Sequence, residues 1–155
     1  MIKLITPLTK VDSVGSLSYT VGSVTQTKEG NEYIYLPGVA SVAQYDWVTF
    51  VTAAGHSFGS VTRLAASAKG QVGIAQGAII EGCHGWFQIK GTGWGKVGAI
   101  FSAGSALYSC GTTATVTDAV VSGDLIAGAF ALGSAAAGGT ALVSIGYPYV
   151  TDTLS

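Results

Sequence analysis

The sequence predicts an all-β domain, either a small barrel or a sandwich, and three observations support this. Short runs rich in β-branched and aromatic residues recur along the 155 residues, separated by many of the 23 glycines. Turn signals return roughly every 8–12 residues, as is typical of barrels and sandwiches. Sustained helical periodicity is nearly absent. The length is that of one domain, since domains span about 100–200 residues.

Nine runs are the expected strands, in chain order residues 17–24, 32–36, 47–52, 72–80, 86–90, 96–101, 114–120, 125–132 and 140–147. In the second run, Tyr33, Ile34 and Tyr35 place large side chains on both faces of the strand. In the third run, threonines fall between apolar neighbours, the partial alternation of a half-buried strand. Residues 61–68 form either a short helix or a strand followed by a loop.

The first thirty residues differ from the rest of the chain. They are rich in Ser, Thr and Val and contain no compact apolar cluster. We therefore expect an extended N-terminal arm or edge strands over residues 1–30, which gain order from a partner, and a β-rich domain over residues 31–155. The candidate partner contacts in the arm are Ile2, Leu4, Ile5 and Leu8.

The composition excludes several classes of function. Only 10% of the residues are charged, against about 25% in soluble domains, while 48% are hydrophobic. A formal net charge of −1 argues against electrostatic capture of nucleic acid or of an anionic membrane. Disorder is excluded because it requires low hydrophobicity and high charge. A nearly neutral, folded protein with few charges remains.

Signals for location and redox state are few. The N-terminus lacks the apolar run of a secretory signal, so we expect synthesis in a cytoplasm, with Cys83 and Cys110 as buried thiols rather than a disulfide. Residues 125–150 carry no charge, but glycine and proline interrupt them too often for a membrane span. We interpret this stretch as two buried strands joined by a turn at residues 137–140.

One motif resembles a catalytic site. Residues 55–59 read Gly-His-Ser-Phe-Gly and match the G-x-S-x-G nucleophile elbow, in which glycines allow a strained turn to expose Ser57. Such hydrolases need an acid and then a histidine after the serine. The only later histidine is His84, and the only intervening acid is Glu81, three residues before it. The chain is therefore expected not to be an enzyme.

Two further motifs suggest ligands only superficially. Cys83 and His84 are adjacent and would point to opposite faces of a strand, so they cannot easily share a metal ion. Residues 91–96 are glycine-rich and end in Lys96, but they lack phosphate-loop spacing and precede a strand. They favour a hairpin loop with Trp94 at its tip, either folded back onto the sheet or used as a contact. No metal or cofactor is expected.

The order of several short motifs resembles bacteriophage capsid decoration proteins, also called head cement proteins. The motifs are EYIYL at residues 32–36, VAQYDWV at 42–48, VGIAQ at 72–76, GWFQIKG at 85–91, GSALYS at 104–109 and LIAG at 125–128. The resemblance covers residues 30–148. It implies a small β-barrel or β-tulip-like domain that trimerises on the outside of the phage head and clamps neighbouring major capsid subunits. In that family the N-terminal segment commonly contacts the capsid.

We therefore expect a structural virion protein, a homotrimer that binds the outer capsid surface and stabilises the shell of the major capsid protein. A cement protein gains free energy from several simultaneous contacts and needs no catalytic pocket. Its partners would be the major capsid protein and itself, without nucleic acid or membrane. The alternative is a phage tail or fibre module, or another surface-binding module, that stacks host glycans on Trp94 or Trp86.

Overall fold

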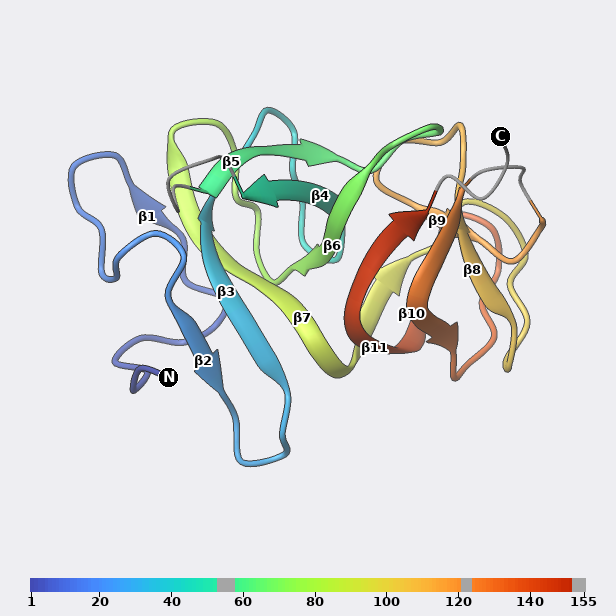
Figure 1. Ribbon diagram of the computed structural model, residues 1–155, viewed down its shortest axis with the longest axis horizontal. Coiled ribbons are helices and arrows are strands. Elements are labelled where there is room, and N and C mark those ends of the chain that lie inside the picture. Colours follow the sequence, from blue (N-terminus) through green and yellow to red (C-terminus); the bar gives the residue numbers. More distant parts are fainter. Residues whose placement is uncertain (53–57, 121–123, 152–155) are drawn as a thin grey trace.

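The computed structural model describes residues 1–52, 58–120 and 124–151 of the chain (Figure 1). Within these residues there are eleven strands and no helix. The strands are β1 (Asp12–Ser13), β2 (Val24–Gln26), β3 (Glu32–Pro37), β4 (Trp47–Thr52), β5 (Phe58–Arg63), β6 (Gly70–Ala75), β7 (Cys83–Lys96), β8 (Ala106–Ser109), β9 (Val116–Thr117), β10 (Leu125–Ala131) and β11 (Thr140–Thr151). All pairings between them are antiparallel, and the predicted all-β class is confirmed.

The strands form two lobes that share β7 (Figure 1). β1 to β6 and the first half of β7 form the N-terminal lobe, residues 1–90. The second half of β7 and β8 to β11 form the C-terminal lobe, residues 91–151. β6, β7 and β11 all pair with one another, because β11 leaves β7 after Gly146 and pairs with β6 at Tyr149. This ring of hydrogen-bonded pairings connects the two lobes rigidly.

Each lobe encloses an apolar core. The N-terminal core includes Ile34, Leu36, Val48, Phe50, Ile79 and Phe87. The C-terminal core includes Val97, Phe101, Leu107, Ile126 and Val143, and the N-terminal lobe contributes Trp47, Leu64, Val72 and Ile74 to the same cluster. In β11, Ala141, Val143 and Ile145 are buried while the residues between them are not, the period-two alternation of a sheet with one solvated face.

Several sequence-based expectations are confirmed. β4 has the bounds expected from its alternating threonines, and β3 is buried along both faces, with Tyr33 and Tyr35 on one side and Ile34 on the other. β10 and β11 are neighbouring strands joined through a turn near residues 137–139, as expected. They are not buried strands, because outward residues such as Phe130 and Tyr149 are about half-exposed. Of the two readings of residues 61–68, the strand followed by a loop is correct.

Residues 91–96 are a strand, and the expectation of a hairpin loop with Trp94 at its tip is wrong. They form the second half of β7 and pair with β11, with Trp94 opposite Leu142. The glycines are explained by close approach of core side chains: a Cβ on Gly93 would lie 2.0 Å from Gln88, and one on Gly95 would lie 2.6 Å from the Trp47 indole. The glycine run accommodates bulky neighbours rather than marking a turn.

Four other expected strands are shorter than predicted or absent. Only residue 24 of the 17–24 run lies in a strand, and the 72–80 run ends at Ala75. The 114–120 run is reduced to β9, and residues 97–101 form only isolated bridges, such as that between Val97 and Val116. β-branched residues favour a strand only where a neighbouring strand completes the hydrogen bonds, and these segments lack one over most of their length.

Candidate interaction surfaces

The N-terminal arm lies on the outer face of the N-terminal lobe, across an aromatic cluster. The cluster consists of Tyr33, Tyr35 and Trp86, which point away from the N-terminal core. Leu4, Leu8 and Tyr19 pack against it. Leu4 and Leu8, two of the candidate partner contacts, thus have a partner within their own chain in this conformation.

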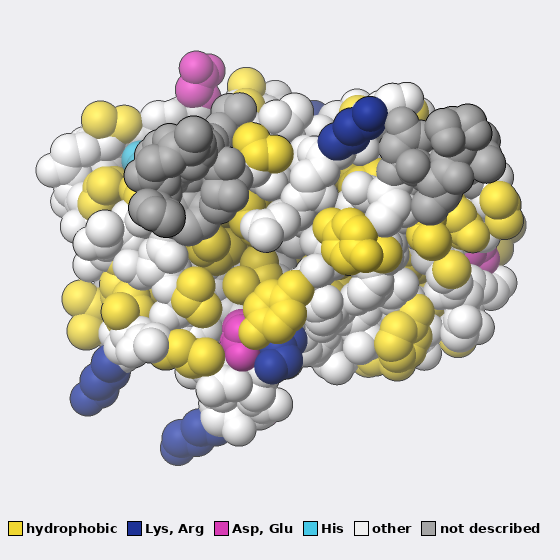
Figure 2. All heavy atoms as spheres, viewed as in Figure 1, with side chains coloured by type: hydrophobic (Ala, Val, Ile, Leu, Met, Phe, Trp, Pro, Cys, Tyr) yellow, Lys and Arg dark blue, Asp and Glu magenta, His cyan; other side chains and the backbone are white. Residues whose placement is uncertain are grey.

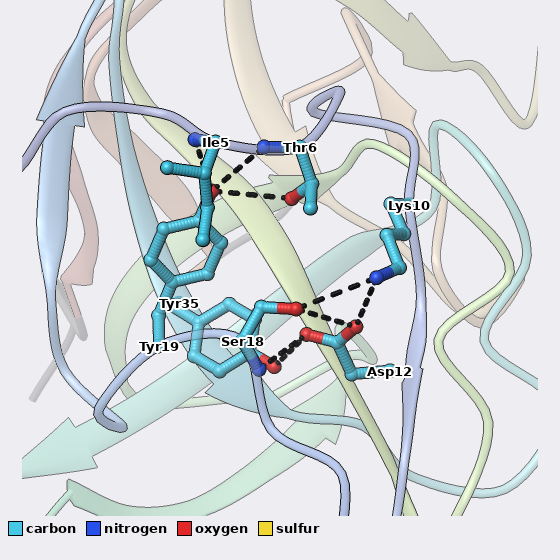
Figure 3. Close-up of polar contacts among 7 residues, drawn as sticks. All are labelled: Ile5, Thr6, Lys10, Asp12, Ser18, Tyr19 and Tyr35. Atoms are coloured by element: carbon cyan, nitrogen blue, oxygen red, sulfur yellow. Dashed lines mark hydrogen bonds and ion pairs between the residues drawn. The ribbon is translucent and has the colours of Figure 1, made fainter.

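Tyr19 links the arm to the N-terminal lobe through hydrogen bonds and ring contacts (Figure 3). Its hydroxyl oxygen accepts hydrogen bonds from the backbone N–H of Ile5 at 2.7 Å and of Thr6 at 3.0 Å. Its ring makes edge contacts with Tyr35 and Trp86 at centroid distances of 5.4 and 5.0 Å. Burial alone would raise the pKa of Tyr19, but the hydrogen bonds from Thr6 and Ile5 outweigh it and lower the pKa.

Asp12 links the next part of the arm, residues 10–18, to β3. This buried carboxylate accepts hydrogen bonds from the Tyr35 hydroxyl and from the N–H and hydroxyl of Ser18, both at 3.0 Å (Figure 3). Lys10 adds an ion pair with 3.3 Å between Nζ and Oδ1. Burial raises the pKa of Asp12, but these hydrogen bonds, led by that of Tyr35, lower it to about 2. The carboxylate therefore stays ionised and links residues 10–18 to β3.

The other two arm candidates point outward. Ile5 is 74% exposed and Ile2 is 37% exposed, although the N–H of Ile2 donates a hydrogen bond to the carbonyl of Val24. Val14 and Leu17, farther along the arm, are also exposed apolar residues. The arm thus presents a set of apolar side chains to solvent while its other face is occupied by the lobe.

The fifth candidate, Trp94, lies on the outer face of the C-terminal lobe. It is half-exposed at the middle of a paired strand, and Thr92 projects from the same face two residues earlier. Across the sheet, Trp94 faces Leu142 and Thr92 faces Ser144. Trp94 is therefore available for contact, from a rigid sheet rather than from a loop.

The outward side chains of this lobe form one apolar surface, which we call the C-terminal face. Besides Trp94 it includes Leu142, Tyr149, Phe130, Ala127, Ala106 and Tyr108. Figure 2 looks onto this region and shows hydrophobic side chains, some of them rings, over β10 and β11. Phe130 and Tyr149 were not among the predicted contact residues. The signal was present, because both alternate with buried neighbours in their strands.

A small cavity lies where β11 passes from β7 to β6. It has a volume of about 170 Å³ and is lined by Ile34, Phe50, Gln71, Val72, Ile89, Tyr147 and Pro148. At its rim the Tyr147 hydroxyl donates a hydrogen bond to Glu32, and Lys90 forms an ion pair with Glu32 at 3.2 Å. The Tyr147 hydrogen bond, with help from Lys90, lowers the pKa of Glu32 despite burial. The polar groups at the rim are already paired, and the remaining lining is mostly apolar.

The motifs with a chemical interpretation are not assembled into a site. His56 and Ser57 of the G-x-S-x-G motif lie outside the described residues. Among residues 1–52, 58–120 and 124–151, no three His, Cys, Asp or Glu side chains are grouped as metal ligands. Cys83 and Cys110 are free thiols, each partly exposed. The described part of the chain contains no helix that could cross a membrane.

Comparison with known proteins gives one informative result. No protein-family model matches the sequence, and no curated protein sequence matches it. Among solved structures, the chain is similar to the head fiber gp8.5 N base in bacteriophage phi29, with a TM-score of 0.50 and 10% sequence identity. The match covers 76% of this chain and 98% of that chain. At this identity, the likeness establishes a common fold.

Proposed function

We propose that this protein is a structural component of a bacteriophage virion. Specifically, it is a homotrimeric decoration protein that binds the outer surface of the phage head and stabilises the shell of the major capsid protein. It is made in the host cytoplasm and has no catalytic role.

The observation that carries the proposal is the fold shared with the head fiber base of phage phi29, which is matched over 98% of its length. This likeness supports the general role, a virion protein associated with the phage head. The order of motifs between residues 30 and 148, which resembles the decoration proteins, supports the more specific role.

The surface chemistry is suited to such a role. The arm exposes Ile2 and Ile5, and the C-terminal face exposes Trp94 and Phe130, so the molecule has two apolar regions on different lobes. Apolar surfaces with few charged side chains form the cores of interfaces, because burying them desolvates little charge. We assign the exposed side of the arm, with Ile2 and Ile5, to contact with the capsid.

The decisive experiment measures binding to undecorated heads of the encoding phage. We expect saturable occupancy by the purified protein and a higher temperature of head disruption after decoration. A matched pair of variants locates the contact: Ile5→Asp should lower occupancy, whereas Thr113→Asp, in the exposed loop before β9 and outside both apolar surfaces, should not. Absence of saturable binding by the wild-type protein would refute the proposal.

A second candidate is a fibre or other surface module that binds glycans. The half-exposed ring of Trp94 favours it, since a sugar can stack on such a ring. Trp86, the other tryptophan considered for this role, is 1% exposed beneath the arm and is not accessible. Strong binding on a glycan array that disappears in Trp94→Ala would favour this candidate over the decoration protein.

A further inference from the structure

Charge is distributed very unequally between the two lobes. Six of the seven Lys and Arg residues lie in residues 1–90, and no Lys, Arg, Glu or His follows Lys96. The two aspartates of the described C-terminal lobe both accept backbone hydrogen bonds, Asp118 from Ser102 and Asp124 from Ser67. Nearly all the charge that keeps a surface hydrated is therefore on the N-terminal lobe.

The C-terminal face is apolar as well as poor in charge. Phe130 is 48% exposed and Tyr149 is 51% exposed, similar to Trp94. Two cations at its border are ion-paired, Lys90 with Glu32 and Lys96 with Asp46. The exposed Lys69 lies beside the end of the face that carries Tyr149, because the next residue, Gly70, pairs with Val150. Lys96 lies two residues beyond Trp94 and projects from the same side of β7, where its ammonium is held by buried Asp46. The other outward side chains named for this face carry no charge.

The size of this face is that of one side of a protein interface. Aromatic side chains bury about 150–250 Å² each, so the exposed halves of Trp94, Phe130 and Tyr149 supply roughly 300 Å², and the partly buried Tyr108 and Leu142 add less. The alanines, threonine and serine between them bring the face toward the roughly 800 Å² that each partner contributes to a standard interface. An apolar patch of a few hundred Å² is comparable with the largest patch on a typical monomer, and such patches are often functional.

We infer that copies of this chain associate with one another through the C-terminal face. A face whose one outward cation, Lys96, is already paired with Asp46 can meet an identical chain with little like-charge repulsion and without burying an unpaired ion. Glycan is a poorer occupant, because few side chains between the rings can form hydrogen bonds with a sugar. Thr92 and Ser144 carry only small hydroxyl groups. The Tyr147 hydroxyl is already bonded to Glu32. The inference rests on the proposed function, in that it identifies the surface that forms the homotrimer.

The assignment separates the two partners of the proposed decoration protein. The exposed side of the arm contacts the head, and the C-terminal face contacts the sister copies. The two surfaces lie on different lobes (Figure 1), so both can be occupied at once. Each additional copy in the assembly then adds a further arm to the attachment, which strengthens it through multivalency.

The test measures the oligomeric state by sedimentation velocity and light scattering over nanomolar to micromolar concentrations. Phe130→Lys places a charge at the centre of the C-terminal face and should weaken association on the order of 100-fold. Trp94→Ser removes an anchor without adding charge and should weaken it in the same direction. Ile5→Lys adds the same charge to the exposed arm and should leave association unchanged. Far-ultraviolet circular dichroism and melting confirm that each variant is folded.

Three results would overturn the inference. The wild-type protein could be monomeric throughout the concentration range, whether or not it binds glycans through Trp94. Both face variants could associate as strongly as the wild type, or Ile5→Lys could weaken association as much as the face variants do. Head binding is measured in parallel to distinguish the two proposals. Saturable head binding with association unaffected by the face variants refutes only the interface. Face-dependent association without head binding refutes only the decoration role.

Discussion

Both lobes have an aromatic surface, but the one on the N-terminal lobe is covered and the one on the C-terminal lobe is exposed. On the N-terminal lobe, Tyr35 and Trp86 are each 1% exposed because the arm lies over them. On the C-terminal lobe, Trp94 and Phe130 remain about half-exposed, and no segment of the described chain covers them. The chain thus contributes its own cover to one sheet face and leaves the other open. This difference is the observation from which we proposed that copies of the chain associate through the C-terminal face.

The same contrast appears in the charges. The arm and the N-terminal lobe contain exposed charges such as Lys3, Lys28, Glu29 and Glu81, which suit a surface that remains in contact with water. The C-terminal lobe has almost none. The low overall charge of the protein is therefore largely a property of one lobe, where the open aromatic face also lies.

The largest expected effect distinguishes the covered face from the open one. Trp86→Ala should lower the free energy of unfolding by about 3–5 kcal/mol, because it leaves a cavity among Tyr19, Tyr35 and the arm. Trp94→Ala should change it by about 0.5 kcal/mol or less when measured at concentrations where the chain is monomeric. Urea denaturation of the two variants provides the comparison. Equal losses would mean that the two faces do not differ as described.

The arm itself has two sides, which a pair of matched substitutions should separate. Leu8→Asp places a charge against the aromatic cluster and should destabilise the fold by about 2 kcal/mol. Ile5→Asp, on the exposed side, should change stability by about 0.5 kcal/mol or less but reduce occupancy of phage heads. Denaturation and head binding are measured on both variants. A large loss of stability in Ile5→Asp would show that its side chain is part of the fold.

Asp12 should make the covered face sensitive to acid. Its pKa in the folded protein is about 2, below its ordinary value of 3.8, so its ionised form stabilises the fold above pH 3.8. That stabilisation is lost as the pH falls from about 4 toward 2. Asp12→Asn should lower the free energy of unfolding at pH 7 by about 1–2 kcal/mol. Between about pH 4 and pH 2, the free energy of unfolding of this variant should fall less steeply than that of the wild type. Stability curves of the two proteins between pH 2 and 7 that run parallel would contradict this role.

The smallest effect is a dependence of the melting temperature on protein concentration. If copies associate through the C-terminal face, the wild-type melting temperature should rise with concentration, because association stabilises the folded state. A dilution series in scanning calorimetry should detect a rise of a few degrees in the wild type and none in Phe130→Lys. Equal slopes for both proteins would place the association elsewhere.

Several elements were predictable from local sequence. The bounds of β4 follow from its alternation, and the burial of β3 on both faces follows from three consecutive large residues. The turn before β11 was also recognised from its glycines. These features depend on the period of side chains along a strand, which is a local property.

The surfaces were less predictable. Ile2, Leu4, Ile5 and Leu8 are similar in sequence, yet two of them pack on the aromatic cluster and two point to solvent. The difference depends on Tyr19 and Asp12, whose bonds to the backbone of Ile5 and to Tyr35 bring distant segments together. Trp94 was misplaced at a loop tip because its glycines resemble a turn, whereas they make room for Trp47 and Gln88.

The sequence by itself determined the all-β class, the positions of the strongest strands and the shortage of charge, because composition and side-chain period are written along the chain. The tertiary structure alone decided which aromatic face is covered and which is open. That outcome depends on the path of the arm and on the pairing of β7 with β11, contacts between segments far apart in sequence. Such contacts leave one set of aromatic residues buried beneath the arm and the other set exposed to solvent.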